Sequence, residues 1–449
     1  MSSSLIDRLR GIAGSNPRRG VGEAGPEASA LTPRCNDEPG GSHDVGRSHA
    51  EATAEALGGH WHEADGRRVL VVDRVYRPGH RHGRLALIDH LLPDDDAWCD
   101  VLLTSKRAPG DRRAGERQRA LFVDLETTGL AGGAGTYAFL VGCAWFEGPV
   151  FRVRQFFMSS LAAERAMLEA LVDVAATASL VVTFNGKTFD LPLIETRYQY
   201  HRRDTPFAAI PHLDMLHPAR RLWRAEEDER EAGGCRLSTL EETLCGHTRE
   251  GDVPGFEIPA RYFHYVRSGD ARPLEPVLEH NRLDLLSLAF LTSRAAHLVD
   301  DGAASLRTAR EAVGLGRLYE RSGEVTHARR CFARASGLDG SRPLAGHQGT
   351  IAEAVHAYAA LCRRERHYAD AAAAWRRLLE MRECPDALLR DASEALAVYH
   401  EHRLRDPRAA RAFAIRSAPL QSTATRRQAL QHRLARLEQK LSAEPLALF

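Results

Sequence analysis

Two acidic residues, Asp124 and Glu126, stand two positions apart in the segment "LFVDLETTGL". The apolar residues around them predict a buried strand, and residues i and i+2 of a strand point to the same face. The two carboxylates would therefore lie side by side, at about 7 Å. Because like charges this close repel and are costly to bury unpaired, the pair indicates a site for a cation.

Further polar residues could join this pair from other segments. Asp190 lies just beyond a predicted strand in "TFNGKTFDLPLI", where residues 185–187 make a turn, and "PHLDML" offers Asp214. In "EHNRLDLLSL", His280 and Asp284 are four residues apart, which places them on one face of a helix. Four carboxylates from three segments could thus converge at one end of a sheet: Asp124, Glu126, Asp190 and Asp284.

Clustered carboxylates without matching Lys or Arg suit Mg²⁺ or Mn²⁺. Two such ions about 3.5–4 Å apart can hold both the attacking and the leaving oxygen of a phosphodiester. A histidine beside a ligand, such as His280, could orient or deprotonate the attacking water. Each motif also has a purely structural interpretation: two acids on a surface strand, a turn at residues 185–190, and a solvated helical pair. Only their combination indicates a phosphodiester hydrolase.

The elements that must position these residues follow from the apolar patterns between residues 119 and 300. Short apolar runs predict strands over residues 121–126, 136–146, 150–158 and 179–186. Helical spacing predicts helices over residues 162–175, 190–201 and 273–299. Ser238 and Glu241 have the spacing of a capping box, which predicts a helix start, and the polar run 225–234 predicts an exposed loop. This mixed order indicates an α/β domain with a mixed central sheet and flanking helices.

The remaining chain divides into three parts. Residues 1–60 are rich in Gly, Ser, Pro and charge, which predicts disorder, and residues 61–118 contain short strand-like runs followed by a basic linker. Residues 305–449 are helical and rich in Ala, Leu and Arg. Small and aromatic residues recur there at offsets typical of tetratricopeptide repeats, which predicts an all-α domain of about three units, with a plain helical bundle as the alternative. These residues are Gly316, Tyr319, Gly323, Ala328, Phe332, Ala335, then Tyr368, Ala371, Trp375, then Tyr399, Ala409, Phe413.

Composition limits the classes of partner and compartment. A net charge of +1 over 449 residues gives no global field for nucleic acid, so any phosphate binding must come from local patches, such as the stretch 401–449 with its ten Lys or Arg against four Asp or Glu. Eight cysteines without a CxxC pair, no signal peptide and no long apolar run predict a cytoplasmic protein without a membrane segment. His80 and His82 in "GHRHG" lack acidic or cysteine neighbours in the sequence, so we do not expect a metal there.

"DLETTGL", "FNGKTFDLPLI" and "HNRLD", in this order, resemble the three motifs of the DEDD superfamily of exonucleases, which have an RNase H-like fold. "IPHLDMLHPARRLW", "CRLSTLEETL", "GDVPGFEIPARYFHYVRSGD" and "VLEHNRLDLLSLAFLT" are similar to the YprB-type branch, whose members can carry tetratricopeptide repeats behind the nuclease domain. The resemblance implies that Asp124, Glu126, Asp190 and Asp284 bind two Mg²⁺ or Mn²⁺ ions.

The same resemblance implies further roles. His280 is the candidate catalytic base, although one DEDD subgroup has Tyr four residues before the last Asp and the subgroup that uses His has it five before. Thr127 and Asn185 are candidate substrate-binding residues. The leading hypothesis is a 3′–5′ exonuclease acting on single-stranded DNA or RNA, with a protein partner docking on the repeats. The alternatives are a nucleic-acid-binding adaptor that acts through its repeats and a metal-dependent hydrolase of small nucleotides.

Overall fold

The structure is a computed structural model that describes residues 42–64, 66–87, 91–103, 119–129, 135–224 and 235–443. Residues Met1–Arg47 and Ser48–Phe449 are separate units, and the contacts reported below lie within the second. The sequence-predicted basic linker and the polar loop 225–234 lie outside the described residues. No helix in the described part of the chain is long and apolar enough to cross a membrane.

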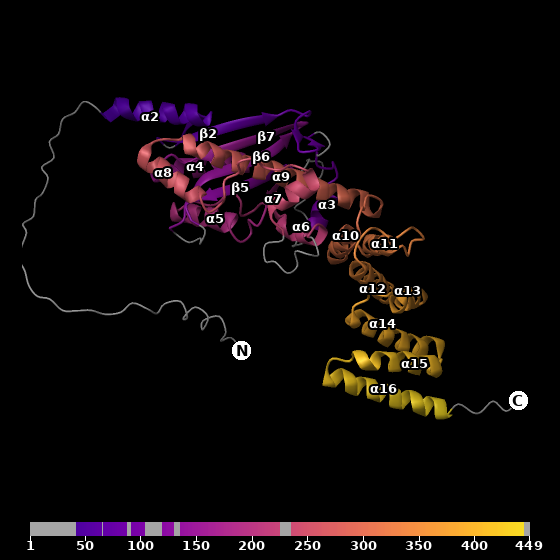
Figure 1. Ribbon diagram of the computed structural model, residues 1–449. Helices are drawn as coiled ribbons and strands as arrows, with labels where there is room; N and C mark the ends of the chain where they lie inside the picture. Colours follow the sequence, from indigo (N-terminus) through magenta and orange to yellow (C-terminus); the bar gives the residue numbers. More distant parts are fainter. Residues whose placement is uncertain are drawn as a thin grey trace, which may run out of the picture. The chain divides into compact units, whose positions relative to one another are not determined.

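A mixed seven-stranded sheet with the order β1-β2-β7-β6-β5-β8-β9 forms the centre of the first half (Figure 1). The five strands from β1 to β5 along this order pair antiparallel, whereas β5, β8 and β9 pair parallel. The mixed sheet and its helices confirm the predicted RNase H-like α/β class. The strands are β1 His60–Ala64, β2 Arg67–Tyr76, β5 Ala120–Thr127, β6 Ala138–Glu147, β7 Val150–Phe157, β8 Leu180–Thr183 and β9 His212–Asp214.

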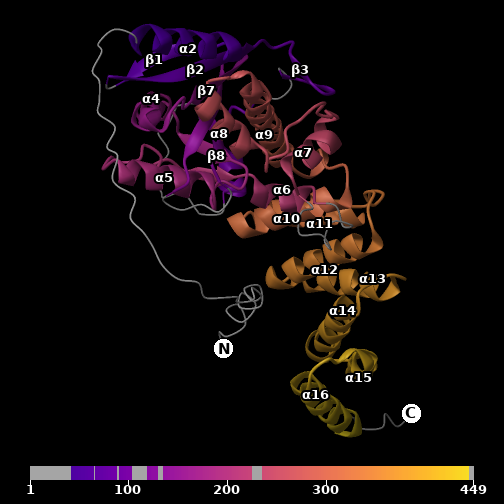
Figure 2. The ribbon, with the colours of Figure 1, turned by 60° about the vertical axis from the view of Figure 1, so that its left-hand side comes forward.

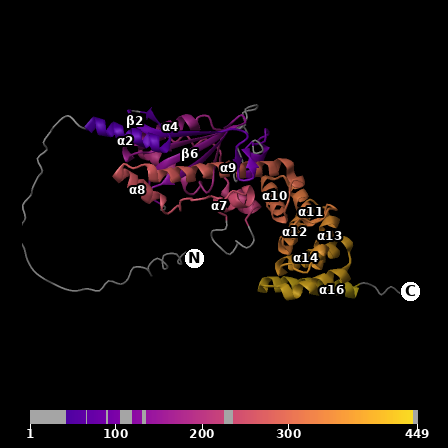
Figure 3. The ribbon, with the colours of Figure 1, turned by 45° about the horizontal axis from the view of Figure 1, so that its top comes forward.

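Helices cover both faces of the sheet, as the alternation of residues along β5 requires. Phe122 belongs to the apolar core shared with helix α9 (Glu275–Asp301), and its neighbours Leu121 and Val123 belong to the core shared with α4 and α5. Figure 3 shows α9 lying across the strands and leading to the C-terminal helices. The other helices of this part are α2 Ser42–Leu57, α3 Ala97–Leu102, α4 Glu164–Ala175, α5 Asp190–Tyr200, α6 Leu216–Leu222, α7 Leu237–Leu240 and α8 Ile258–Ser268.

The C-terminal region consists of stacked helix pairs, α10 with α11, α12 with α13 and α14 with α15, followed by α16 (Figure 2). This confirms the predicted all-helical region and its repeating units. Its first helix packs on α6, and Trp223 donates its indole N–H to Glu311 at 3.2 Å. The bounds are α10 Ala309–Ser322, α11 Val325–Ser336, α12 Gln348–Arg364, α13 Tyr368–Glu380, α14 Asp386–Tyr399, α15 Pro407–Ser417 and α16 Ala424–Ala443.

The N-terminal part differs from the sequence expectation. Residues 42–57, inside the segment expected to be disordered, form α2, in which Ala50 accepts the indole N–H of Trp61 at 3.0 Å. Strands β1 and β2 extend the main sheet through β2–β7 pairing instead of forming a separate β-rich segment. The segment has too few apolar residues for its spacing to predict a helix. Contacts with residues outside the segment stabilise α2 instead.

Some cations of the basic C-terminal stretch are paired within the fold. Arg436 and Lys440 of α16 contact the carboxylate of Glu401 at 2.8 Å each, and the guanidinium of Arg403 lies 3.9 Å from the ring centroid of Tyr368. The two contacts with Glu401 join α16 to the end of the α14 segment, and the contact of Arg403 joins that segment to α13. The basic excess of this stretch therefore serves packing at these positions.

Candidate active site

The central strand β5 carries the first two acids. Asp124 pairs across the sheet with Gly142 of β6, and the register between the two strands shifts between Glu126 and Thr127. Both acids share the strand face of Phe122, which is the face that α9 covers. Glu126 is 9% exposed. Their placement on one face is as the spacing predicts.

The structure brings the other two acids to the same place. Asp190 is the first residue of α5, directly after the turn that follows β8, and Asp284 lies in the third turn of α9. Burial raises the pKa of Asp124 well above its usual range, and the negative charges of Asp284, Glu126 and Asp190 add to that rise. The negative charges of the other three acids therefore act on Asp124.

The other acids of the cluster also have raised pKa values. Burial, then Asp284 and Asp190, raise the pKa of Glu126, and burial, then Asp214 and Asp284, raise the pKa of Asp190 to about 7. Burial also raises the pKa of Asp284, where Arg249 and His280 limit the rise. Carboxylate oxygens are the donor set that Mg²⁺ and Mn²⁺ prefer, so the chemistry of these four residues suits such ions. One oxygen of Asp284 is already paired with Arg249 at 2.5 Å.

Asn281 is a member of the site that sequence reasoning missed. It is fully buried, and its amide donates to the carboxylate of Asp124 at 2.8 Å while its oxygen accepts from Gln155 at 2.8 Å. A Cβ on Gly142 would lie 2.2 Å from the Asn281 oxygen, so glycine is required there for α9 to approach the sheet. The available signal was the spacing in "HNRLD", where residues 281 and 284 share a helix face.

His280 lies between two carboxylates. Its Nδ1 is 2.6 Å from Asp252, and its Nε2 is 3.7 Å from Oδ2 of Asp284. Burial raises the pKa of Asp252, but the hydrogen bond with His280 and the charges of His280 and Arg249 outweigh it, so this pKa lies below the usual value. Asp252 comes from an irregular loop and carried no sequence signal.

The two candidate substrate-binding residues engage in local turns. The Thr127 hydroxyl donates to the carbonyl of Gly129 at 2.9 Å, and the Asn185 side chain accepts from Thr188 at 3.1 Å. Asn185 has a φ of 70°, and its N–H donates to Asp214 at 2.7 Å. Asp214 also accepts the N–H groups of Lys187 and Leu216, so it holds the turn that presents Asp190.

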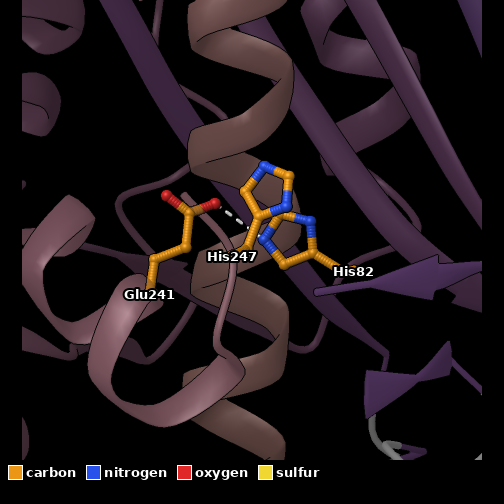
Figure 4. Close-up of side chains that lie close together, drawn as sticks. All are labelled: His82, Glu241 and His247. Carbon is orange, nitrogen blue, oxygen red and sulfur yellow. Dashed lines mark ion pairs between the residues drawn. The ribbon is translucent and has the colours of Figure 1, made fainter. Parts of the chain in front are cut away.

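A second cluster of polar side chains contacts Arg249 through Glu241. His82, Glu241 and His247 offer ligand atoms that all lie within 4.8 Å of one another, a donor set that could hold a metal ion (Figure 4). His82 Nε2 is 2.7 Å from Glu241, which supplies the acidic partner that the sequence did not indicate. However, the His82 and His247 rings are stacked at 4.3 Å with planes 26° apart, so their in-plane lone pairs do not converge on one point.

Glu241 has a different role from the predicted capping residue. Helix α7 begins at Leu237, next to the predicted helix start, but no side chain caps it, so Ser238 and Glu241 do not form the expected capping box. The Glu241 carboxylate instead turns inward, where it is fully buried and accepts from Ser287 at 2.6 Å and from Arg249 at 2.6 Å. A buried carboxylate needs hydrogen-bonding and charged partners. The energy of these contacts is larger than that of a helix cap at the surface.

Comparisons with known proteins agree with this architecture. Residues 121–296 match the model of the RNase H superfamily, so this stretch is an RNase H-like domain. The chain is 34% identical over 223 residues to the Bacillus subtilis protein YprB, which is described as uncharacterized. This match covers 49% of the chain and 52% of YprB, so the chain spans about half the length of this relative.

Among solved structures, the chain is similar to the family B DNA polymerase from the archaeon Pyrobaculum calidifontis, with 12% identity and a TM-score of 0.33. The match covers 49% of this chain and 29% of the polymerase. A similarity this low supports no argument about activity.

Proposed function

We propose that this protein is a metal-dependent nuclease that hydrolyses phosphodiester bonds of single-stranded nucleic acid, removing nucleotides from the 3′ end. The observation that carries the proposal is the grouping of four carboxylates from β5, α5 and α9, of which Glu126 is buried and the other three are half-buried. Their negative charges raise one another's pKa. A cluster of this kind is costly to the fold unless cations are bound. The RNase H superfamily match over residues 121–296 supports phosphodiester chemistry.

Asp124, Glu126, Asp190 and Asp284 would hold two Mg²⁺ or Mn²⁺ ions. When bound, such ions neutralise the scissile phosphate and make a bound water more acidic. Asn281 orients the Asp124 carboxylate through its 2.8 Å hydrogen bond. His280, whose Nδ1 lies 2.6 Å from Asp252, would accept a proton from the attacking water.

The test is Mn²⁺-dependent degradation of single-stranded DNA and RNA of equal sequence, each labelled at the 5′ end. The native protein is compared with Asp124→Asn, which keeps the size of the side chain and an acceptor for Asn281. We expect a ladder of products shortened from the 3′ end, lost in the variant and on chelation. The faster substrate then identifies the nucleic acid, and an internal cut pattern would replace the exonuclease proposal with an endonuclease.

The stacked helix pairs are proposed to bind a protein partner. If a folded native protein binds Mn²⁺ but cleaves neither DNA nor RNA, the adaptor alternative is favoured, and the helix pairs become the functional region. Release of mononucleotides from dinucleotides alone would instead favour a hydrolase of small nucleotides.

A further inference from the structure

A buried chain of polar contacts leads from Asp284 to the strand β3 (Arg81–His82). Arg249 donates to Oδ1 of Asp284 at 2.5 Å and to Glu241 at 2.6 Å. Glu241 in turn lies 2.7 Å from Nε2 of His82. The side chains of Arg249, Glu241 and His82 are 5%, 0% and 2% exposed, so water does not replace these contacts.

The far end of this chain is fixed by close backbone packing. Arg84 donates its N–H to the carbonyl of Cys245 at 2.8 Å. A Cβ on Gly83 would lie 2.4 Å from that carbonyl oxygen, and both Gly83 and Gly246 have positive φ, at 61° and 66°. The His82 ring also stacks on Phe290 of α9 at 5.3 Å. The β3 segment is therefore locked against the turn at residues 245–247.

Arg249 is the branch point of the chain. Besides Glu241 and Asp284, its guanidinium donates to Asp252 at 3.3 Å. A planar guanidinium can serve three carboxylates in a fixed geometry, which the single ammonium of lysine cannot. Because Arg249 takes Oδ1 of Asp284, the Asp284 side chain cannot rotate freely, and its Oδ2 stays 3.7 Å from His280.

We propose that Arg249 is a positioning residue that holds the Asp284 carboxylate for cation binding, and that Glu241 and His82 hold Arg249. This inference rests on the proposed function. It makes the β3 segment, which lies outside the region matched to the RNase H superfamily, part of the support of the site. Removing Arg249 has two opposed effects: it deletes a positive charge that repels cations, and it frees Asp284. We expect the loss of orientation to dominate, since Glu241 and Asp252 would also lose their common partner.

The chain offers a matched control. Arg197, 1% exposed, donates to the buried Glu164 at 2.5 Å, and His201 lies 2.8 Å from the same carboxylate. Glu164 thus has an arginine and a histidine partner as Glu241 does, and the guanidinium of Arg197 also lies over the rings of Tyr137 and Tyr200, at 4.2 and 4.7 Å from their centroids. Arg197→Ala therefore reproduces the cost of unpairing a buried carboxylate, here that of Glu164.

The experiment measures Mn²⁺ binding to the full-length protein by titration calorimetry, at a temperature where circular dichroism shows every variant folded. We expect Arg249→Ala to weaken Mn²⁺ binding about 10- to 100-fold, with Glu241→Gln acting in the same direction and Arg249→Lys restoring binding only in part. Arg197→Ala should lower the unfolding temperature but leave the Kd for Mn²⁺ within about threefold. With substrate, Arg249→Ala should lower kcat and leave KM nearly unchanged.

The outcomes separate the two proposals. A native protein that binds no Mn²⁺ would overturn the proposed function itself. If the native protein binds Mn²⁺ and Arg249→Ala binds it equally or more tightly, Arg249 is a competing charge and the positioning role is wrong. Equal losses in Arg249→Ala and Arg197→Ala would show a general effect of stability, and full rescue by Arg249→Lys would show that charge alone matters.

Discussion

The side-chain amide of Asn281 donates to both the backbone carbonyl and the carboxylate of Asp124, at 3.1 and 2.8 Å. A single buried residue of α9 thereby fixes the height of the helix over β5 and the orientation of the first acid of the site. Gln155 of β7 completes the arrangement by donating to Asn281 and to the carbonyl of Leu278. The orientation of the Asp124 carboxylate thus depends on groups that carry no charge.

Replacing Asn281 by Ala should weaken both the site and the fold. The Gln155 amide would lose a buried acceptor, so we expect a loss of about 1–3 kcal/mol in the free energy of unfolding. Because the orientation of Asp124 would be lost, Mn²⁺ affinity should fall about 10- to 100-fold. Urea unfolding and titration calorimetry measure the two effects. Thr292→Ala, on the same helix and also buried, is the control, and an equal loss of Mn²⁺ affinity there would contradict the prediction.

The acidic cluster should make the metal-free protein less stable as the pH rises. Burial and the neighbouring acids raise the pKa of Asp190 from 3.8 to about 7 in the folded state. An acid with a raised folded pKa contributes stability that is present below its unfolded pKa and is lost as the pH rises through the folded pKa. We therefore expect the melting temperature in chelator to fall between about pH 4 and pH 7.

Asp190→Asn should reduce this dependence and raise the stability of the metal-free protein at pH 8 by about 1–3 kcal/mol. The same variant should lose activity. Asp173→Asn, on the exposed face of α4, should change neither quantity. Thermal denaturation with and without Mn²⁺ at several pH values tests this, and a metal-free protein that becomes more stable toward pH 8 would argue against the cluster.

The contact of α16 with the preceding helices should fail in acid. The hydrogen bond with Arg436, together with Lys440, lowers the pKa of Glu401 to about 2 against an ordinary value of 4.5. A carboxyl group whose pKa is lower in the folded state than in the unfolded state stabilises the fold at high pH. This stabilisation is lost as the pH falls from the unfolded pKa to the folded pKa, here from about 4.5 to about 2. Hydrogen exchange of residues 424–443 should accelerate over this range. Glu401→Gln should show fast exchange already at pH 7.

The packing of α10 against α6 should depend on a glycine, Gly314. A Cβ on Gly314 of α10 would lie 2.3 Å from the backbone oxygen of Arg221, next to the end of α6. Alanine favours helix by about 1 kcal/mol, but overlap with backbone cannot be relieved by a rotamer change, so we expect Gly314→Ala to cost about 1–3 kcal/mol. Gly349→Ala in α12, where no atom lies within 4 Å, should be neutral or slightly stabilising in urea unfolding. Equal effects of the two changes would contradict this packing.

The local features of this protein were predictable from its sequence. Strand β5 and helix α9 have the apolar periods of their element types, so the shared strand face of Asp124 and Glu126 and the helix spacing of His280 and Asp284 follow from the chain itself. The stacked helix pairs were predictable for the same reason, because small and aromatic residues recur at fixed offsets within each repeat.

The partners of these residues were decided by tertiary structure. Arg249 comes from an irregular loop, and nothing near it in the sequence shows that it meets Asp284, thirty-five positions later. The local spacing of Glu241 predicted a helix cap, yet burial against His82 and Arg249 gave it another role. Local patterns encode the element and the face on which a side chain lies. Which charge compensates a buried carboxylate depends on which segments pack together, and that is set by the core of the whole domain.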